Sequence, residues 1–140
     1  MKDEIRYTDE LAGVTAGMLQ GFFVGWPNPP SAETHLALLE HSDEIVLAVD
    51  DANGRVVGFI TAHTDVILTA YIPLLEVLPT FQSQGIGSEL VRRMLVKLNH
   101  LYAIDLMCDP ETVPFYQRLG MRPATGMMIR NYEKQSGAKQ

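Results

Sequence analysis

The chain has 140 residues, of which 46% are hydrophobic, so it can form one domain with a core of its own. Its net charge of −6 disfavours binding to nucleic acid and suits a cationic partner. The only cysteine, Cys108, excludes an internal disulfide, and no Cys/His cluster has zinc spacing, so we expect no metal site. The apolar runs are too short to span a membrane, and no apolar signal stretch follows Met1, so we expect a cytoplasmic protein.

The first half of the chain is predicted to contain three strands and two helices. In chain order these are a strand at 4–7, a helix at 9–23, a helix at 31–41, and strands at 45–49 and 56–62. Ser31 is a suitable N-cap for the second helix. Asn53-Gly54 lies between the last two strands and indicates a hairpin, because both residues tolerate positive φ.

The second half is predicted to continue with alternating strands and helices. The expected elements are a strand at 68–78, a helix at 87–100, a strand at 103–108, a short helix at 112–120 and a final strand at 127–132. Leu90, Met94 and Leu98 lie on one stripe of the helix at 87–100, which is the most regular in the chain. The order predicts a single mixed α/β domain over residues 1–132, with a frayed tail at 133–140.

The segment from Val77 to Ser88 joins a predicted strand to the start of that regular helix. A helix start presents unpaired N–H groups and a partial positive charge, and Gly85 and Gly87 would let an anionic ligand approach the backbone. We therefore expect a phosphate-binding loop. A P-loop would need Lys after Gly87, and a dinucleotide fingerprint would need glycine where Leu90 stands, so neither pattern fits.

Gln82, Gly85 and Gly87 instead match the pattern [QR]-x-x-G-x-[GA], and Leu75-x-Val77-x-Pro79 precedes them. This string resembles the acetyl-CoA motif of the GNAT acetyltransferase superfamily. The resemblance implies a GNAT-like fold, with a mixed central sheet of six to seven strands and about four helices on its faces. It also implies that acetyl-CoA is the co-substrate. By position, the residues expected to contact the coenzyme are Leu75, Val77, Gln82, Ser83, Gln84, Gly85, Ile86, Gly87 and Ser88.

A second segment, residues 109–121, resembles the family pattern N-x-x-A-x-x-F-Y-x-x-L-G-F. Asp109 stands where relatives carry an Asn that often touches the coenzyme, so we expect Asp109 at that contact. Taken alone, Phe115 and Tyr116 would be ordinary core residues. The resemblance instead implies that Tyr116 is the general acid, because a phenol with a pKa of about 10 can donate a proton to a departing thiolate.

An alkyl ammonium must lose a proton before it attacks a thioester, so a base is needed nearby. Glu76 is the leading candidate, because it lies on the strand expected to carry the thioester. A solvent-facing Glu76 is an equally good interpretation. His63 and Asp105 are weaker candidates for the base, and we expect Cys108 to be an inert core residue.

The loop at 22–30 often covers the acceptor side in relatives, so Phe23 and Trp26 are candidate substrate-binding residues. The same residues could form a packed loop or a dimer contact, because aromatic side chains are enriched at interfaces. The sequence favours neither interpretation.

The sequence therefore predicts an N-acetyltransferase in which a primary amine, on a small molecule or a peptide, attacks acetyl-CoA directly. No nucleic acid or membrane partner is expected, and a homodimer is an open alternative. Two other functions remain as hypotheses. One is a non-catalytic acyl-CoA sensor or protein-interaction module on the same fold, and the other is a loop that binds a nucleotide or another phosphate.

Overall fold

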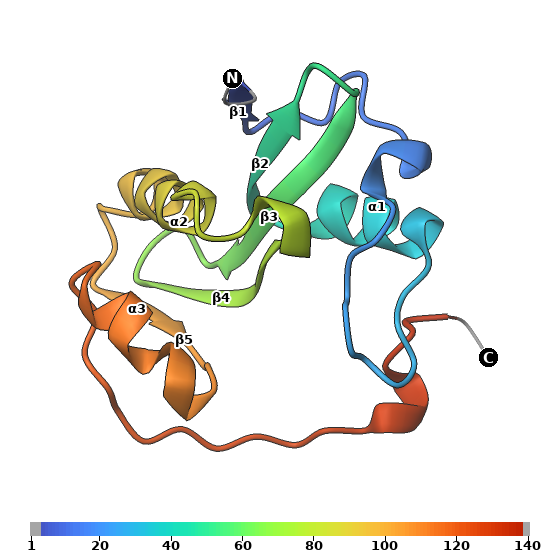
Figure 1. The fold of residues 1–140 in the computed structure, drawn as a ribbon. Helices are drawn as coiled ribbons and strands as arrows, with labels where there is room; N and C mark the ends of the chain where they lie inside the picture. Colours follow the sequence, from blue (N-terminus) through green and yellow to red (C-terminus); the bar gives the residue numbers. More distant parts are fainter. Residues whose placement is uncertain (1–3, 139–140) are drawn as a thin grey trace.

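A five-stranded sheet in the order β1-β2-β3-β4-β5 forms the centre of the computed structural model, which describes residues 4–138 (Figure 1). The strands are β1 (Ile5–Thr8), β2 (Glu44–Asp50), β3 (Arg55–Thr64), β4 (Thr69–Val77) and β5 (Ala103–Leu106). The first four pair antiparallel with their neighbours in the chain, and β5 joins β4 in parallel.

Three α-helices and four short 3₁₀ turns complete the described chain. The helices are α1 (Ala32–His41), α2 (Ile86–Lys97) and α3 (Val113–Gln117). The 3₁₀ turns are η1 (Ala16–Leu19), η2 (Pro79–Phe81), η3 (Pro110–Thr112) and η4 (Tyr132–Lys134). Among residues 4–138, no helix has the length and apolar character needed to cross a membrane.

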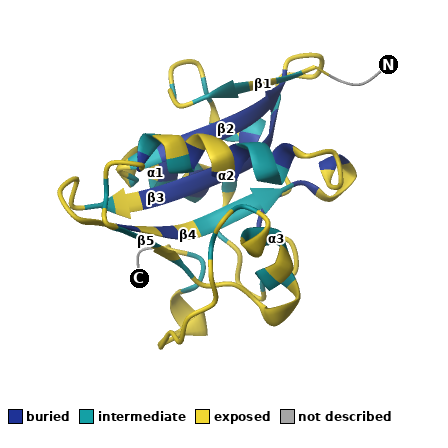
Figure 2. Ribbon diagram, turned by 90° about the vertical axis from the view of Figure 1, so that its left-hand side faces the viewer, coloured by how far each residue is buried: buried dark blue, intermediate teal, exposed yellow. Residues whose placement is uncertain are grey.

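The sheet is covered on both faces, by α2 on one side and by α1 with η1 on the other (Figure 1). For this reason β2 and β3 are buried along almost their whole length instead of on alternate residues (Figure 2). Gly58 of β3 allows α2 to approach closely, since a Cβ atom there would lie 3.1 Å from Leu90 Cδ1. The two central strands thus form the rigid base on which the site is built.

Two local predictions are confirmed. Ser31 caps α1, with its Oγ accepting a hydrogen bond from the Thr34 N–H at 3.1 Å. β2 and β3 form the predicted hairpin, in which Gly54 adopts a φ of 68°. Asn53 does not adopt positive φ, and its side-chain oxygen instead accepts a hydrogen bond from the Arg55 N–H at 3.2 Å.

The predicted helix at 9–23 is wrong, because only the single turn η1 forms there. Gly13 and Gly21 adopt φ values of 81° and 94°, which a helix does not allow, and Gly17 lies between them. Each glycine costs a helix about 1 kcal/mol relative to alanine. The periodic apolar residues of this stretch therefore belong to a folded loop and not to a helix.

The prediction of six to seven strands and about four helices is also wrong in number, because the described residues contain five strands and three α-helices. The missing strand is the one predicted at 127–132. Residues 121–131 are extended but pair with no strand of the described chain.

His35 of α1 is a buried polar residue within an aromatic cluster. Its side chain is 1% exposed, and neither ring nitrogen has a hydrogen-bond partner among the described residues. The rings of Phe22, Phe23 and Phe59 lie 5.3, 4.9 and 4.3 Å from it, centroid to centroid. Burial lowers the pKa of His35 from 6.5 to about 4, because the charged ring would lose its hydration.

This pKa shift predicts a loss of stability in mild acid. Between pH 6.5 and about pH 4 the unfolded His35 binds a proton that the folded one does not. The free energy of unfolding should therefore decrease as the pH is lowered, by up to about 1.4 kcal/mol per pH unit. Urea unfolding of His35→Phe should show a smaller fall over this range, whereas the exposed control His41→Phe should behave like the parent. Equal slopes in all three proteins would contradict the assignment.

Candidate functional site

The site begins where β4 and β5 separate. They pair from Thr69 opposite Ala103 to Ile72 opposite Leu106, and β4 then continues to Val77 without a partner strand on that side in the described chain. Pro73 follows the last pair and has no N–H to continue the ladder. The edge of β4 from Pro73 to Val77 is therefore open.

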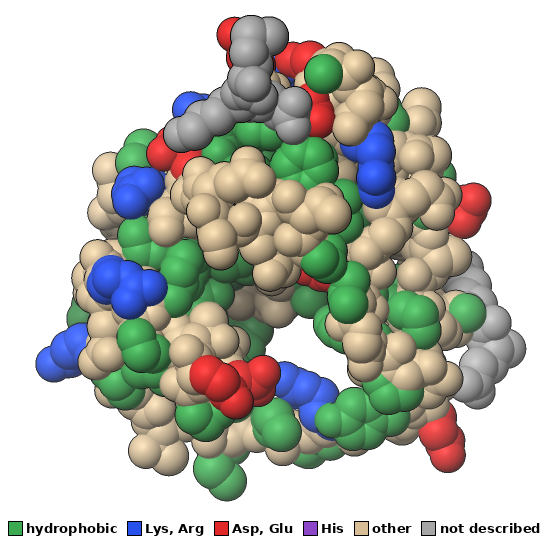
Figure 3. All heavy atoms as spheres, viewed as in Figure 1, with side chains coloured by type: hydrophobic (Ala, Val, Ile, Leu, Met, Phe, Trp, Pro, Cys, Tyr) green, Lys and Arg blue, Asp and Glu red, His purple; other side chains and the backbone are tan. Residues whose placement is uncertain are grey.

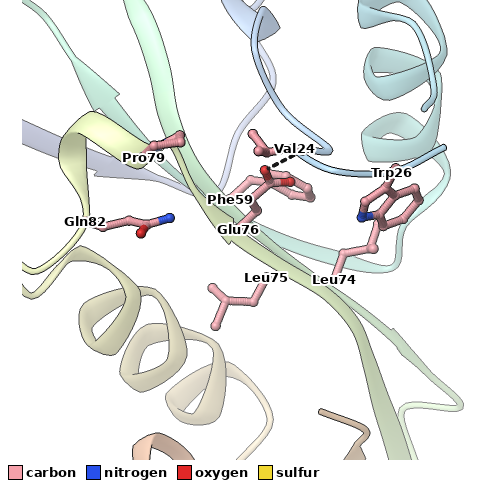
Figure 4. Close-up of a pocket in the computed structure, with 8 residues that line it drawn as sticks. All are labelled: Val24, Trp26, Phe59, Leu74, Leu75, Glu76, Pro79 and Gln82. Atoms are coloured by element: carbon pink, nitrogen blue, oxygen red, sulfur yellow. Dashed lines mark hydrogen bonds between the residues drawn. The ribbon is translucent and has the colours of Figure 1, made fainter. Parts of the chain in front are cut away.

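A pocket of about 370 Å³ lies beside this open edge (Figure 4). Its walls come from β3, β4, the loop before α1 and the turn after β4, and the lining residues are Val24, Trp26, Phe59, Leu74, Leu75, Glu76, Pro79 and Gln82. Phe59 contributes because it is the direct neighbour of Glu76 in the β3–β4 register. Six of these eight residues are apolar, and Glu76 contributes the one carboxylate.

Glu76 holds the loop that forms one wall of this pocket. Its Oε1 accepts a hydrogen bond from the Phe23 N–H at 2.8 Å, and its Oε2 accepts one from the Val24 N–H at 3.3 Å (Figure 4). Phe23 has a φ of 64°, an unusual value for a non-glycine residue, and its ring packs 4.8 Å from that of Trp26. The carboxylate thus lines the pocket and also fixes the backbone that brings Trp26 to it.

The loop predicted to bind phosphate, residues 83–88, follows β4 and η2. Ser83 and Gly85 adopt φ values of 63° and 86°, which turn the chain into the start of α2. The main-chain N–H groups of residues 83–88 donate no hydrogen bond within the described residues. Gln82 fixes the loop to the strand, because its Nε2 donates to the Val77 carbonyl oxygen at 3.0 Å. A row of free donors at the positive end of a helix suits a diphosphate.

Tyr116 lies on α3, outside the residues that line the pocket. Its ring packs 4.9 Å from that of Phe115, and Phe115 Cζ lies 3.6 Å from the position that a Cβ of Gly87 would take. Tyr116 is therefore close to the phosphate-binding loop. Burial, with a smaller effect of Cys108, raises the pKa of Tyr116 to about 12, so its hydroxyl keeps its proton at neutral pH.

The structure brings some of the predicted site residues together and not others. The pocket contains four of them, Leu75, Glu76, Gln82 and Trp26. Phe23 does not line the pocket, but its main-chain N–H donates a hydrogen bond to Glu76. Asp109 is exposed at the start of η3 and does not line the pocket.

The weaker candidates lie elsewhere. His63 is exposed and pairs with Asp43 at 3.7 Å, and Asp105 is exposed on β5. Cys108 is also exposed, so its expected core position is wrong; it lies just after β5, where the chain leaves the sheet. Within residues 4–138, no group of three His, Cys, Asp or Glu side chains could hold a metal ion.

The sequence did not identify Phe59, Leu74 or Pro79 as pocket residues, and it included Val24 only as part of the loop at 22–30. Phe59 could have been found only from the register between β3 and β4, which shifts between Thr61 and His63. That shift depends on tertiary packing and leaves no clear pattern in the chain.

Comparison with known proteins agrees with this geometry. The profile of the Acetyltransferase (GNAT) family matches residues 11–121. A crystal structure of an acetyltransferase candidate from Deinococcus radiodurans R1 is 48% identical, with a TM-score of 0.94 over 97% of this chain and 94% of that one.

Two curated relatives match over shorter stretches. The uncharacterized N-acetyltransferase ycf52 of Pyropia yezoensis is 32% identical over 69% of this chain and 58% of its own length. Serotonin N-acetyltransferase 2, chloroplastic, of Oryza sativa subsp. japonica is 33% identical over 77% of this chain and 56% of its own length. The chain thus spans less than two thirds of the length of these relatives.

The two hydrogen bonds of Glu76 predict a measurable cost when its carboxylate is removed. In Glu76→Ala the N–H groups of Phe23 and Val24 lose their acceptor, and Phe23 is buried. The free energy of unfolding should fall by about 1–3 kcal/mol in urea titrations. The exposed Glu40→Ala should change it by less than about 0.5 kcal/mol. Equal effects of the two substitutions would show that Glu76 does not hold the loop.

Proposed function

The chain belongs to the GNAT acetyltransferase family, and from that premise we propose that it transfers the acetyl group of acetyl-CoA to a primary amine by direct attack. The observation that carries this proposal is the row of free N–H groups at residues 83–88, which lies beside the open edge of β4. Acetyl-CoA would supply a diphosphate for those donors and an activated thioester. No acyl-enzyme is needed, because a bound amine can attack the thioester itself.

Two side chains are proposed to handle protons. Glu76 is the carboxylate of the pocket, so it is the group best placed to accept a proton from an ammonium acceptor, directly or through water. Tyr116 keeps its proton at neutral pH, since its pKa is about 12, and it lies close to the phosphate-binding loop. Its hydroxyl would donate a proton to the sulfur that leaves.

The pocket also suggests the class of acceptor. Val24, Trp26 and Leu74 provide apolar walls around the carboxylate of Glu76. A molecule with one ammonium group and an aromatic or alkyl body matches this combination, because its cation can pair with the carboxylate while its body contacts the indole ring and the aliphatic side chains. The rice relative that matches this chain is named for such an amine, serotonin. The net charge of −6 also favours cationic acceptors.

The most direct experiment measures free thiol released from acetyl-CoA with a panel of amines. We expect release with arylalkylamines such as tryptamine and serotonin, and at least about tenfold lower kcat/KM with polyamines or aminoglycosides, whose additional charges meet apolar walls. A preference for polycationic acceptors would contradict the proposed class. Tight binding of acetyl-CoA without release for any amine would favour the non-catalytic sensor instead.

The role of Tyr116 can be tested separately. Tyr116→Phe removes only the hydroxyl, so kcat should fall by about 10²- to 10⁴-fold with little change in acetyl-CoA affinity. Because the pKa of Tyr116 is about 12, the parent should also show no alkaline loss of kcat from this group below about pH 11. Tyr102→Phe, at a tyrosine that is 85% exposed, serves as the control and should leave kcat unchanged. Unchanged turnover in Tyr116→Phe would remove this residue from the mechanism.

A further inference from the structure

An exposed segment with several apolar residues follows α3. Residues 121–131, which we call the C-terminal arm, are extended, and all but Met121 are exposed (Figures 1 and 2). Met127, Met128 and Ile129 have exposed fractions of 91%, 61% and 94%. Consecutive residues of an extended chain point to opposite faces, so the arm presents apolar side chains on both. Such a pattern is typical of a strand that is covered on both sides.

The main chain of the arm is also largely unpaired. The Met121 N–H donates to the Tyr116 carbonyl oxygen at 3.1 Å, and the Asn131 carbonyl oxygen accepts from the Lys134 N–H at 3.1 Å. Between these two ends, no main-chain N–H of residues 122–130 donates a hydrogen bond within the described chain. An extended segment with apolar faces and free main-chain groups has the properties of a β-strand that lacks a neighbouring strand.

The sheet also lacks a strand beside β5. This strand pairs with β4 on one side only, so its other edge is open within the described chain. The arm lies close to the end of β5 at Gly126, where a Cβ atom would lie 3.4 Å from Cε of Met107, the residue after β5. Figure 3, drawn in the orientation of Figure 1, shows an opening through the molecule between its lower rim, where the arm runs, and the body of the fold.

Both ends of the arm are held so that it passes β5 without lying along it. At one end it is bonded to α3 through Met121. At the other end, the Asn28 N–H donates to Gln135 Oε1 at 2.8 Å and Asn28 Nδ2 donates to the Tyr132 carbonyl oxygen at 3.0 Å. An extended segment of this length spans roughly 35 Å, so the arm bridges the distance between its anchors. Folding back onto its own β5 would break the contacts with Asn28.

We propose that a second copy of this chain pairs with both the C-terminal arm and the open edge of β5. Residues 127–131 of one copy pair with the open β5 edge of the other, and the exchange is reciprocal about a two-fold axis. Each copy carries one unpaired arm and one open β5 edge, so two copies pair both arms with both β5 edges and leave a closed dimer. This interface is independent of acetyl transfer.

The charges of the two surfaces support this partner. The arm contains Arg122 and Arg130 and no acidic residue, although the whole chain has a net charge of −6. Residues 103–112, which include β5 and the turn after it, contain Asp105, Asp109 and Glu111 and no basic residue. All five of these side chains are exposed within one copy. Arg130 of the pairing segment and Asp105 of β5 have opposite charges and so favour this pairing, whereas two identical arms would repel each other.

The test combines mass with hydrogen exchange on the complete chain. Light scattering after size exclusion should give about twice the chain mass of 15.6 kDa. The amides of residues 103–107 and 127–131 should exchange more slowly as protein concentration rises, whereas those of β2 should not change. Ile129→Lys should raise the dimer dissociation constant at least about tenfold, because a buried apolar contact is replaced by a charge. The matched control Ile67→Lys, at an isoleucine that is 81% exposed in the β3–β4 loop, should leave it unchanged.

Three results would overturn the proposal. A monomer at all concentrations would show that no second copy binds. A monomer with protected arm amides would show that the arm closes onto its own sheet. A dimer in which the arm exchanges freely, or which Ile129→Lys does not weaken, would place the interface on another surface. Because Ile129 is 94% exposed within its own copy, its replacement should not impair folding, and far-UV circular dichroism would verify this.

Discussion

Parallel strands that separate leave main-chain groups without partners, and the rest of this site depends on that separation. β4 and β5 pair over only four residues before Pro73 interrupts the ladder. The open edge of β4 then continues directly into the turn that starts α2. Unpaired main-chain groups therefore occur on the open edge of β4 and again at residues 83–88, while the turn between them is fixed by hydrogen bonds such as that from Gln82 to the Val77 carbonyl oxygen. An extended ligand with an anionic end could use both sets of groups.

Glu76 connects β4 to the loop that forms the opposite wall of the pocket. Its carboxylate accepts two N–H groups from the loop before α1, so the position of Trp26 depends on a side chain from β4. The same loop packs on the aromatic cluster around His35, which contains no hydrogen-bond partner for the imidazole. This wall of the pocket is thus supported by the hydrogen bonds to Glu76 and by aromatic packing around His35.

Much of the fold could be predicted from local patterns. The capped helix after Ser31, the hairpin at Asn53-Gly54 and the glycine-containing turn into α2 all follow from residues close together in the chain. The pocket was predicted only in part, because Phe59 reaches Glu76 through a register that long-range packing determines. The helix expected at 9–23 failed because three glycines outweigh apolar periodicity. The strand predicted at 127–132 does not form because a strand needs a neighbouring strand to pair with. The residue pattern of one segment does not specify that neighbour.

The order of the strands also affects how the domain folds. β1 pairs with β2 across a long connection, but β2, β3 and β4 form a meander with short loops, and such local pairings close quickly. β5 can pair with β4 only after α2 has folded back across the sheet. The open edge of β4 beside the pocket therefore forms late, after the meander of β2, β3 and β4. A nascent chain would acquire its core before it acquires any capacity to bind its ligand, so substitutions near Pro73 should affect the last step of folding more than the first.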